Sequence, residues 1–168
     1  MFLDFASLPI TSRLWIYQAD RFLLPDEEKK AQAALQSFLG EWTAHQQALQ
    51  ASGQIAQQRF LLIAVNEDFQ SVSGCAIDAS VHFLQALGQE LSLNWFERQK
   101  VIFESTPGQV AALGLAEIPK AIAEGSLRPE TQVFNILLSS IGDWQKNWPQ
   151  PAQDSWLARY FQTMTQTH

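Results

Sequence analysis

The feature that most constrains this chain is a run of six apolar residues, Phe60 to Val65, its longest unbroken apolar stretch. Successive side chains of a strand point to opposite faces of a sheet, so a strand without polar positions must be covered on both faces. The run therefore predicts a central strand inside a folded core. A membrane-spanning helix needs roughly 20 apolar residues, so we expect no membrane partner.

Length and composition indicate a globular protein, and its charge argues against nucleic acid as a partner. The chain has 168 residues, of which 46% are hydrophobic, and this predicts one globular domain over residues 1–168. Seventeen acidic residues against 11 basic ones give a formal charge of −6. Binding to phosphate backbones depends on lysine and arginine, so we expect no nucleic-acid partner.

Apolar periodicity and turn signals predict alternating strands and helices. The resulting βαββαβ order indicates an α+β fold with a ferredoxin-like core. A three-layer α/β fold with a mixed sheet is the alternative. The predicted elements are a strand over Arg13–Ala19, a helix from an Asp26 N-cap to about His45, strands over Ser52–Gln57 and Arg59–Val65 joined by a hairpin near Gln57-Gln58, a helix from a Ser73 N-cap through Leu91, and a strand over Lys100–Glu104.

The remainder of the chain predicts a C-terminal helix-strand-helix extension. A helix is expected over Ala116–Glu124, with Gly125 just past its end. A strand over Thr131–Leu138 follows. A short final helix, capped by Asp154 or Ser155, runs through Tyr160.

Several motifs of known chemistry are missing from the sequence. It contains no phosphate-binding loop and no Gly-x-Ser-x-Gly elbow, which argues against a P-loop ATPase. With one cysteine and three histidines it has no paired zinc ligands, so we predict no metal and no cofactor. A single cysteine cannot form an internal disulfide, and the first residues lack a basic segment typical of export signals. We therefore expect a cytoplasmic protein, and we favour a non-enzyme.

Four segments together resemble a family of small uncharacterised bacterial proteins that often carry the label "ABC transporter ATPase". The segments are FLGEWTAHQQAL, RFLLIAVNED, SGCAIDASVHFL, and TQVFNILL with the later DSWLARY. The resemblance extends from Trp15 to about Tyr160, and Ser73-Gly74-Cys75 is its most specific part. It implies a bacterial protein but no activity. Where the family pattern has a glycine and an aspartate, this sequence has Gln46 and Asn66.

Cys75 is the first candidate for chemistry. If Ser73 is the N-cap, Cys75 lies in the first helical turn, where free backbone N–H groups and the helix dipole favour a thiolate or a bound anion. Ser73, Gly74 and Asp78 then become candidate binding residues, although the Asp78 charge opposes a thiolate. We expect a positive φ or a crowded site at Gly74. The alternative is that Cys75 is a small packing residue.

His45 is the second candidate catalytic residue. It continues the apolar stripe of Phe38 and Trp42 to the predicted C-terminal end of the first helix, where the dipole favours a protonated imidazole. A histidine at the edge of the core is the alternative. Arg59 is a candidate binding residue that could instead form a salt bridge with Glu67, Asp68 or Asp78.

Half of the six tryptophans, Trp144, Trp148 and Trp156, lie near the C-terminus. They predict either ordinary core or an interface with a protein partner, a homodimer included, since aromatic side chains are enriched at the centres of interfaces. Two functions follow from the sequence. The first is a module that binds an unknown small ligand or protein, and the second is a thiol-dependent enzyme or redox sensor that uses Cys75.

Overall fold

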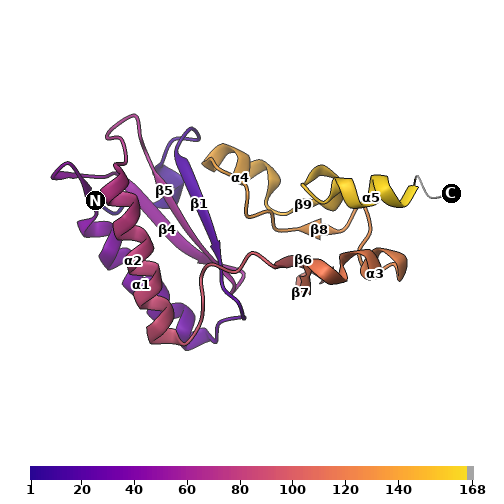
Figure 1. Cartoon of the computed structure of the whole chain (residues 1–168). Coiled ribbons are helices and arrows are strands. Elements are labelled where there is room, and N and C mark those ends of the chain that lie inside the picture. Colours follow the sequence, from indigo (N-terminus) through magenta and orange to yellow (C-terminus); the bar gives the residue numbers. More distant parts are fainter. Residues whose placement is uncertain (166–168) are drawn as a thin grey trace. The chain divides into compact units, whose positions relative to one another are not determined.

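The computed structural model describes residues 1–165, which divide into two compact units (Figure 1). Unit 1 comprises Met1–Glu97 and Ile136–Gln145, and unit 2 comprises Arg98–Asn135 and the chain from Lys146 onward. A single domain over residues 1–168 stays a prediction. In chain order the elements are η1 (Phe5–Ser7), β1 (Arg13–Gln18), α1 (Pro25–Glu41), β2 (Thr43–Ala44), β3 (Gln47–Ala48), β4 (Ala51–Ala56), β5 (Phe60–Val65), α2 (Gly74–Leu91), β6 (Lys100–Thr106), β7 (Gln109–Gly114), η2 (Leu115–Glu117), α3 (Ile118–Ala123), β8 (Gln132–Val133), α4 (Ile141–Asn147), β9 (Gln150–Pro151), η3 (Ala152–Asp154) and α5 (Ala158–Thr165).

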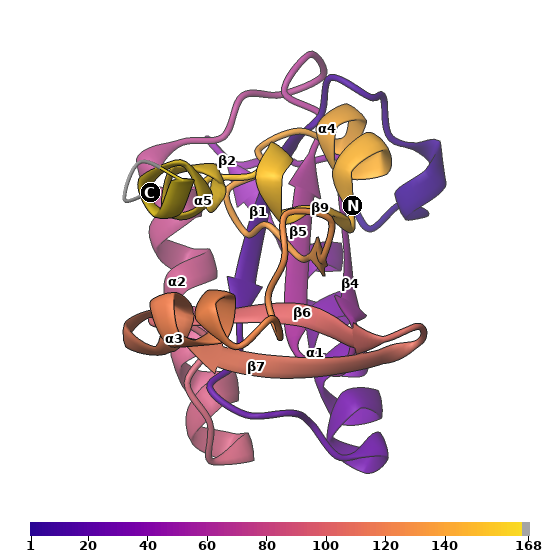
Figure 2. The same cartoon turned by 90° about the vertical axis from the view of Figure 1, so that its right-hand side faces the viewer.

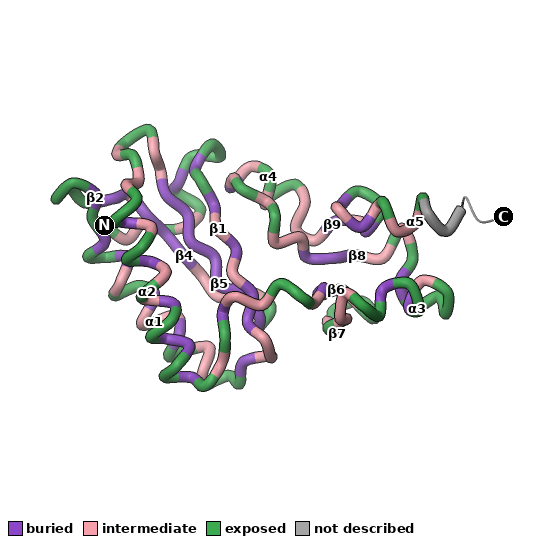
Figure 3. Tube along the Cα trace, in the orientation of Figure 1, coloured by how far each residue is buried: buried purple, intermediate pink, exposed green. Residues whose placement is uncertain are grey.

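The main sheet of unit 1 has three antiparallel strands in the order β1-β5-β4. Helices α1 and α2 cover the same face of this sheet (Figure 1). All six residues of β5 are buried, as Figure 3 shows along the length of the strand. The prediction that the apolar run forms a central, buried strand is therefore confirmed.

A tight turn joins β4 to β5. Its two central residues, Gln57 and Gln58, have φ values of 55° and 53°. The Arg59 N–H donates to the Ala56 carbonyl over 3.1 Å and closes the turn, and Ala56 pairs with Phe60, so three residues lie between the strands. Positive φ at both central residues of such a turn is typical of type I′, whose twist matches that of the paired strands. The predicted hairpin is thus confirmed, although glutamine has a side chain that disfavours this conformation.

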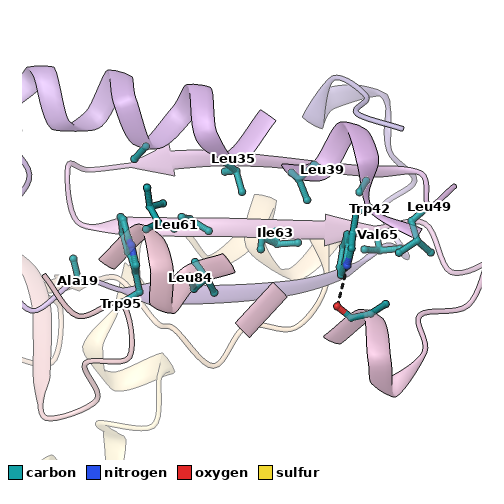
Figure 4. Close-up of a cluster of buried hydrophobic side chains, with 14 of the residues drawn as sticks. Ala19, Leu35, Leu39, Trp42, Leu49, Leu61, Ile63, Val65, Leu84 and Trp95 are labelled. Carbon is teal, nitrogen blue, oxygen red and sulfur yellow. Dashed lines mark hydrogen bonds between the residues drawn. The ribbon is translucent and has the colours of Figure 1, made fainter. Parts of the chain in front are cut away.

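The core of unit 1 lies between the two helices and the sheet. Alternate residues of β5, such as Leu61 and Ile63, point toward the helices and pack against leucines of α1 and α2. Trp95, from the segment after α2, is 1% exposed. Figure 4 shows the central members of this cluster, which are Ala19, Leu35, Leu39, Trp42, Leu49, Leu61, Ile63, Val65, Leu84 and Trp95.

A segment from late in the sequence completes unit 1. The Leu14 N–H donates to the Ser139 carbonyl over 2.9 Å, at the outer edge of β1. The Ile141 N–H donates to the Ser12 carbonyl over 3.1 Å, and the Ile141 side chain is fully buried. Residues 136–145 are thus part of the unit formed by the first 97 residues.

Unit 2 has a small antiparallel sheet in the order β7-β6-β8-β9. Its longest strands, β6 and β7, form a hairpin beside α3 (Figure 2). The core of unit 2 contains side chains from the sheet and from the helical segments. Its buried members are Val101, Phe103, Ile118, Ala121, Leu127, Val133, Ala152 and Leu157.

The α+β class is confirmed, but the strand order does not confirm a ferredoxin-like core. The strand predicted over Lys100–Glu104 exists as β6, yet it pairs with β7 and β8 instead of joining β1, β5 and β4. All strand pairs in the described sheets are antiparallel, so the mixed sheet of the alternative prediction is not found there.

The predicted extension is correct in part. Helix α3 is present, and Gly125 follows it with φ 79°. The strand expected over Thr131–Leu138 is only Gln132–Val133, and the final helix begins at Ala158, after both predicted caps. No helix in the described part of the chain has the length and apolar character needed to cross a lipid bilayer.

Candidate functional site

A cavity of about 470 Å³ lies in unit 1, where the end of α1 and the β2–β3 hairpin meet the start of α2. We call it the Cys75 cavity. Three residues singled out from the sequence, His45, Ser73 and Cys75, line it together. Its full lining is Phe38, Glu41, Trp42, Thr43, His45, Ser73, Cys75, Ala76 and Ala79.

His45 reaches this cavity from a turn, not from a helix. Helix α1 ends at Glu41, because Trp42 has an extended backbone with φ −70° and ψ 128°. Strands β2 and β3 follow, and the turn between them contains His45 at φ 52° and Gln46 at φ 65°. The prediction that the first helix continues to His45 is therefore wrong, and the helix dipole does not act on this exposed imidazole as expected.

The start of α2 has the capping predicted for it. The Ser73 Oγ accepts a hydrogen bond from the Ala76 N–H over 3.1 Å, and the Ser73 carbonyl accepts one from Ile77 over 3.0 Å. The first two helical N–H groups, those of Gly74 and Cys75, have no partner within the helix. Cys75 itself is exposed, so it is not the buried packing residue of the alternative interpretation.

Gly74 differs from its prediction. Its φ lies outside the left-handed region, and a Cβ added to it would meet no atom within 4 Å. The expectation of a positive φ or a crowded site at Gly74 is therefore wrong. The helix start is open, and Ser73 enters it in an extended conformation with φ −88° and ψ 162°.

An aromatic floor closes the cavity on the side of the core. The Trp42 Nε1–H donates to the Ala76 carbonyl over 2.9 Å, shown by the dashed line in Figure 4. This bond ties the end of α1 to the first turns of α2. The Phe38 ring lies 5.5 Å from that of Trp42 and stacks on Phe83 of α2 at 4.5 Å. The floor is thus held in place from both helices.

The chain matches no protein-family model, no curated protein and no solved structure. The resemblance to the small bacterial family stays a hypothesis.

The cavity offers polar and reactive groups without a metal cluster. Within the described residues, no three histidine, cysteine or acidic side chains gather as a metal ion would require. Glu41 and His45 are the titratable neighbours of the thiol at this cavity. The arrangement can hold a small molecule against the floor and can present one thiol to it.

Arg59 does not belong to this site. It is 2% exposed, its Nε–H donates to the Ala19 carbonyl over 2.7 Å, and its guanidinium lies over the Phe22 ring at 4.6 Å. Burial lowers the pKa of the guanidinium, while the charges of Glu97 and Asp20 raise it. Among the described residues, the alternative salt bridge of Arg59 with Glu67, Asp68 or Asp78 is not formed. Arg59 precedes β5 whereas Glu67 and Asp68 follow its other end, and Glu67 pairs with Arg13 at 3.6 Å.

The remaining predicted residues are dispersed. Asp78 is exposed on α2 and does not line the Cys75 cavity. Trp144 packs edge-on against Phe5, and Trp148 against Phe134. Trp156 contacts Tyr160 and joins the core of unit 2. Each of these tryptophans is half-buried in a different aromatic pair, and an interface role for them stays a prediction.

Sequence reasoning missed four of the lining residues that shape the cavity. Phe38 and Trp42 continue the apolar stripe of α1, and such a stripe predicts core residues. Glu41 and Thr43 carry no motif. The sequence signal for these residues is the end of the apolar stripe at Trp42. If the helix ends there, Phe38 and Trp42 lie in or beside its last turn and can contact the segment that follows the helix.

Proposed function

We propose that this protein binds a small amphipathic molecule in the Cys75 cavity. The observation that carries the proposal is that His45 and Cys75, 30 positions apart in the sequence, line one cavity with Trp42 as its floor. A volume of about 470 Å³ lies within the usual range of small-ligand sites, roughly 300–1,000 Å³.

The lining indicates how such a molecule would be oriented. The faces of Phe38 and Trp42 suit a flat apolar group. The polar groups of the lining are the hydroxyls of Ser73 and Thr43, and the free N–H groups at the start of α2 lie beside them. A polar end of the ligand would hydrogen-bond there, because helix N-termini present unpaired donors.

A thiol-dependent activity is the second candidate, and the exposure of Cys75 favours it. In the simplest reaction the thiolate attacks a small disulfide, forms a mixed disulfide with one half and releases the other half as a thiolate. The same cavity would bind the substrate, and His45 would accept the thiol proton.

Ligand binding is tested by a thermal-shift screen of small metabolites, followed by alkylation with iodoacetamide. Because the chain has one cysteine, every alkylated sulfur is that of Cys75. A ligand of the cavity raises the melting temperature by mass action and slows alkylation. Both effects should disappear in Phe38→Ala, which removes part of the floor.

The matched control is Phe69→Ala, which removes an aromatic ring that is 55% exposed and lies outside the cavity. Compounds that bind the natural chain should raise the melting temperature of this variant and slow its alkylation to the same extent. The proposal fails if the hits stabilise Phe38→Ala equally or leave the alkylation rate unchanged.

The thiol function has a separate readout. It requires Cys75 to react faster at pH 7 than a free thiol such as N-acetylcysteine, and His45→Ala to slow the reaction. A rate equal to that of the free thiol rejects this second candidate and leaves ligand binding untouched.

A further inference from the structure

Strand β7 is an outer strand of the sheet in unit 2, where it forms a hairpin with β6 (Figure 2). Its sequence, QVAALG, contains no charged residue and no proline. The register shifts between Glu104 and Thr106 of β6, but the pairing is regular from Val110 to Gly114. Charges, prolines, bulges and covering segments are the usual means of keeping an outer strand from pairing with another chain. Residues 109–114 carry neither a charge nor a proline on this edge.

The other outer strands of the two larger sheets are protected. In unit 1, Ser139 bonds to the edge of β1, and Met1, Leu3 and Gln32 bond to the edge of β4. In unit 2, the strand at the far side of the sheet is β9, which has two residues and ends in Pro151. A short strand with a proline is a poor template for pairing, because proline has no N–H to donate. Strand β7 thus differs from these three edges.

The hydrogen bonds of β6 determine which groups of β7 point outward. The Leu115 N–H donates to the Gln99 carbonyl over 2.9 Å at the end of the hairpin. On an antiparallel strand, residues alternate between bonding to the partner strand and pointing away from it. The Ile102 carbonyl, opposite Ala112, accepts from the Phe134 N–H over 3.0 Å and so points away from β7, as this alternation requires. The residues of β7 with outward N–H and C=O groups are therefore Val110, Ala112 and Gly114.

One of the outward donors is already used. The Gly114 N–H donates to the Glu117 Oε2 over 3.2 Å. The outward N–H and C=O groups of Val110 and Ala112 have no hydrogen-bond partner within residues 1–165. Ala112 is also exposed. These two residues together offer two donors and two acceptors to an approaching strand.

This set of groups is complementary to itself. When two identical strands pair antiparallel about a two-fold axis at Ala111, Val110 of each copy lies opposite Ala112 of the other. The two pairs then exchange four hydrogen bonds, which use every free outward group of these residues. We propose that β7 pairs with β7 of a second copy of this chain, antiparallel and with Ala111 opposite itself, so that one sheet continues across both copies.

Side chains and charge favour this partner and this register. Strands without charged residues do not repel their own copies, and the small Ala111 side chain permits the close approach of a pair that is not hydrogen-bonded. An axis at Ala112 would bring the Val110 carbonyl of the second copy to the Gly114 N–H, where the Glu117 carboxylate already lies. Two acceptors would then face each other. The pairing does not depend on the ligand proposed for the Cys75 cavity.

The first test is sedimentation of the full chain at concentrations from about 5 to 500 µM, the range expected for a small interface. The mass should rise from that of one chain toward that of two. Ala112→Pro removes an outward N–H and no bond to β6, which edge strands tolerate. It should weaken dimerisation at least about tenfold, because two of the four hydrogen bonds are lost. Circular dichroism of this variant checks that its fold is unchanged.

The second test measures the register by disulfide formation in a Cys75→Ser background. Ala111→Cys should form a covalent dimer on oxidation with diamide, since the two-fold axis places the two new thiols opposite each other. Gln109→Cys is the matched control, because its two copies would lie about 13 Å apart along the strands, beyond the reach of a disulfide.

Three results would overturn the proposal. The first is a mass that stays at one chain up to about 500 µM, which would leave the β7 edge to a segment of another protein. The second is a dimer that Ala112→Pro does not weaken, which would place the interface elsewhere. The third is cross-linking of Gln109→Cys as complete as that of Ala111→Cys.

Discussion

Two glycines of unit 1 have opposite surroundings, and they predict opposite effects of the same substitution. Gly74→Ala places a methyl group in open space at the start of α2, and alanine restricts the unfolded chain. We expect the free energy of unfolding to rise by up to about 1 kcal/mol. Urea denaturation measures it, and a lower midpoint would contradict the open site.

Gly53 is the matched control for that substitution. A Cβ at Gly53 would lie 2.7 Å from the Leu62 carbonyl oxygen and 2.9 Å from side-chain carbons of Leu35 and Leu39. Gly53→Ala should therefore destabilise the fold by about 1–3 kcal/mol through overpacking. Equal midpoints for the two alanine variants would show that neither environment is as described.

The Arg21–Glu27 pair predicts a pH dependence of stability. Two charge-assisted hydrogen bonds from Arg21, of 2.9 and 2.7 Å, and one from the Leu24 N–H lower the pKa of Glu27 from 4.5 to about 2. A depressed carboxyl pKa stabilises the fold above the unfolded value, and this contribution is lost as the pH falls from about 4.5 to about 2. Denaturant titrations across that window should show a flatter pH dependence for Glu27→Gln, and an unchanged slope would refute this.

At the scale of single elements, a substitution in the turn between β4 and β5 should stabilise the fold. Both of its central residues are glutamines with positive φ. Gln58→Gly removes the steric cost of that conformation, so we expect the free energy of unfolding to rise by about 1 kcal/mol. Gln36→Gly, on the exposed face of α1, should lower it by about the same amount. Denaturation curves of both variants test the difference in sign.

The outer edge of strand β4 is covered at Ala51 by backbone hydrogen bonds with Met1 and Leu3, and further along the strand by one side chain. The Gln32 amide of α1 accepts a hydrogen bond from the Ile55 N–H over 3.0 Å and donates to the Gly53 carbonyl over 3.4 Å. It thus imitates a neighbouring strand and blocks pairing with another chain. Gln32→Ala should increase concentration-dependent association in light scattering, whereas Gln36→Ala on the same helix should not. Equal scattering by both variants would show that the edge is protected by other means.

The same elements show what the sequence could predict. The apolar run of β5 and the Ser73 cap of α2 are local signals, and both were interpreted correctly. The pairing of Lys100–Glu104 was not, because a strand pattern identifies a strand but not its neighbour. The apolar stripe of Phe38 and Trp42 predicts a helix through His45, and the turn found there has positive φ at His45 and Gln46 without glycine or asparagine, the usual residues for it. The sequence therefore indicates His45, Ser73 and Cys75 as members of the candidate site, but it does not indicate Glu41, Thr43 or the aromatic floor.

At the scale of the whole molecule, unit 1 depends on a segment that follows most of its sequence. A fragment ending at Glu97 lacks the bonds that Ser139 and Ile141 make with the edge of β1. We expect its melting temperature to rise when a synthetic peptide of residues 136–145 is added, by mass action. A scrambled peptide of the same composition is the control. A fragment that is unaffected by the native peptide would show that the segment adds no stability.

Because a part of unit 2 separates the two segments of unit 1 in the sequence, unit 1 cannot be completed early in translation. A ribosome delivers residues in order, and the first part of unit 2 emerges before residues 136–145 do. The Leu14 N–H at the edge of β1 therefore lacks its partner, the Ser139 carbonyl, until the intervening chain has been translated. Nascent chains halted just before and just after this segment should differ in protease resistance of their N-terminal half, with the longer chain the more resistant.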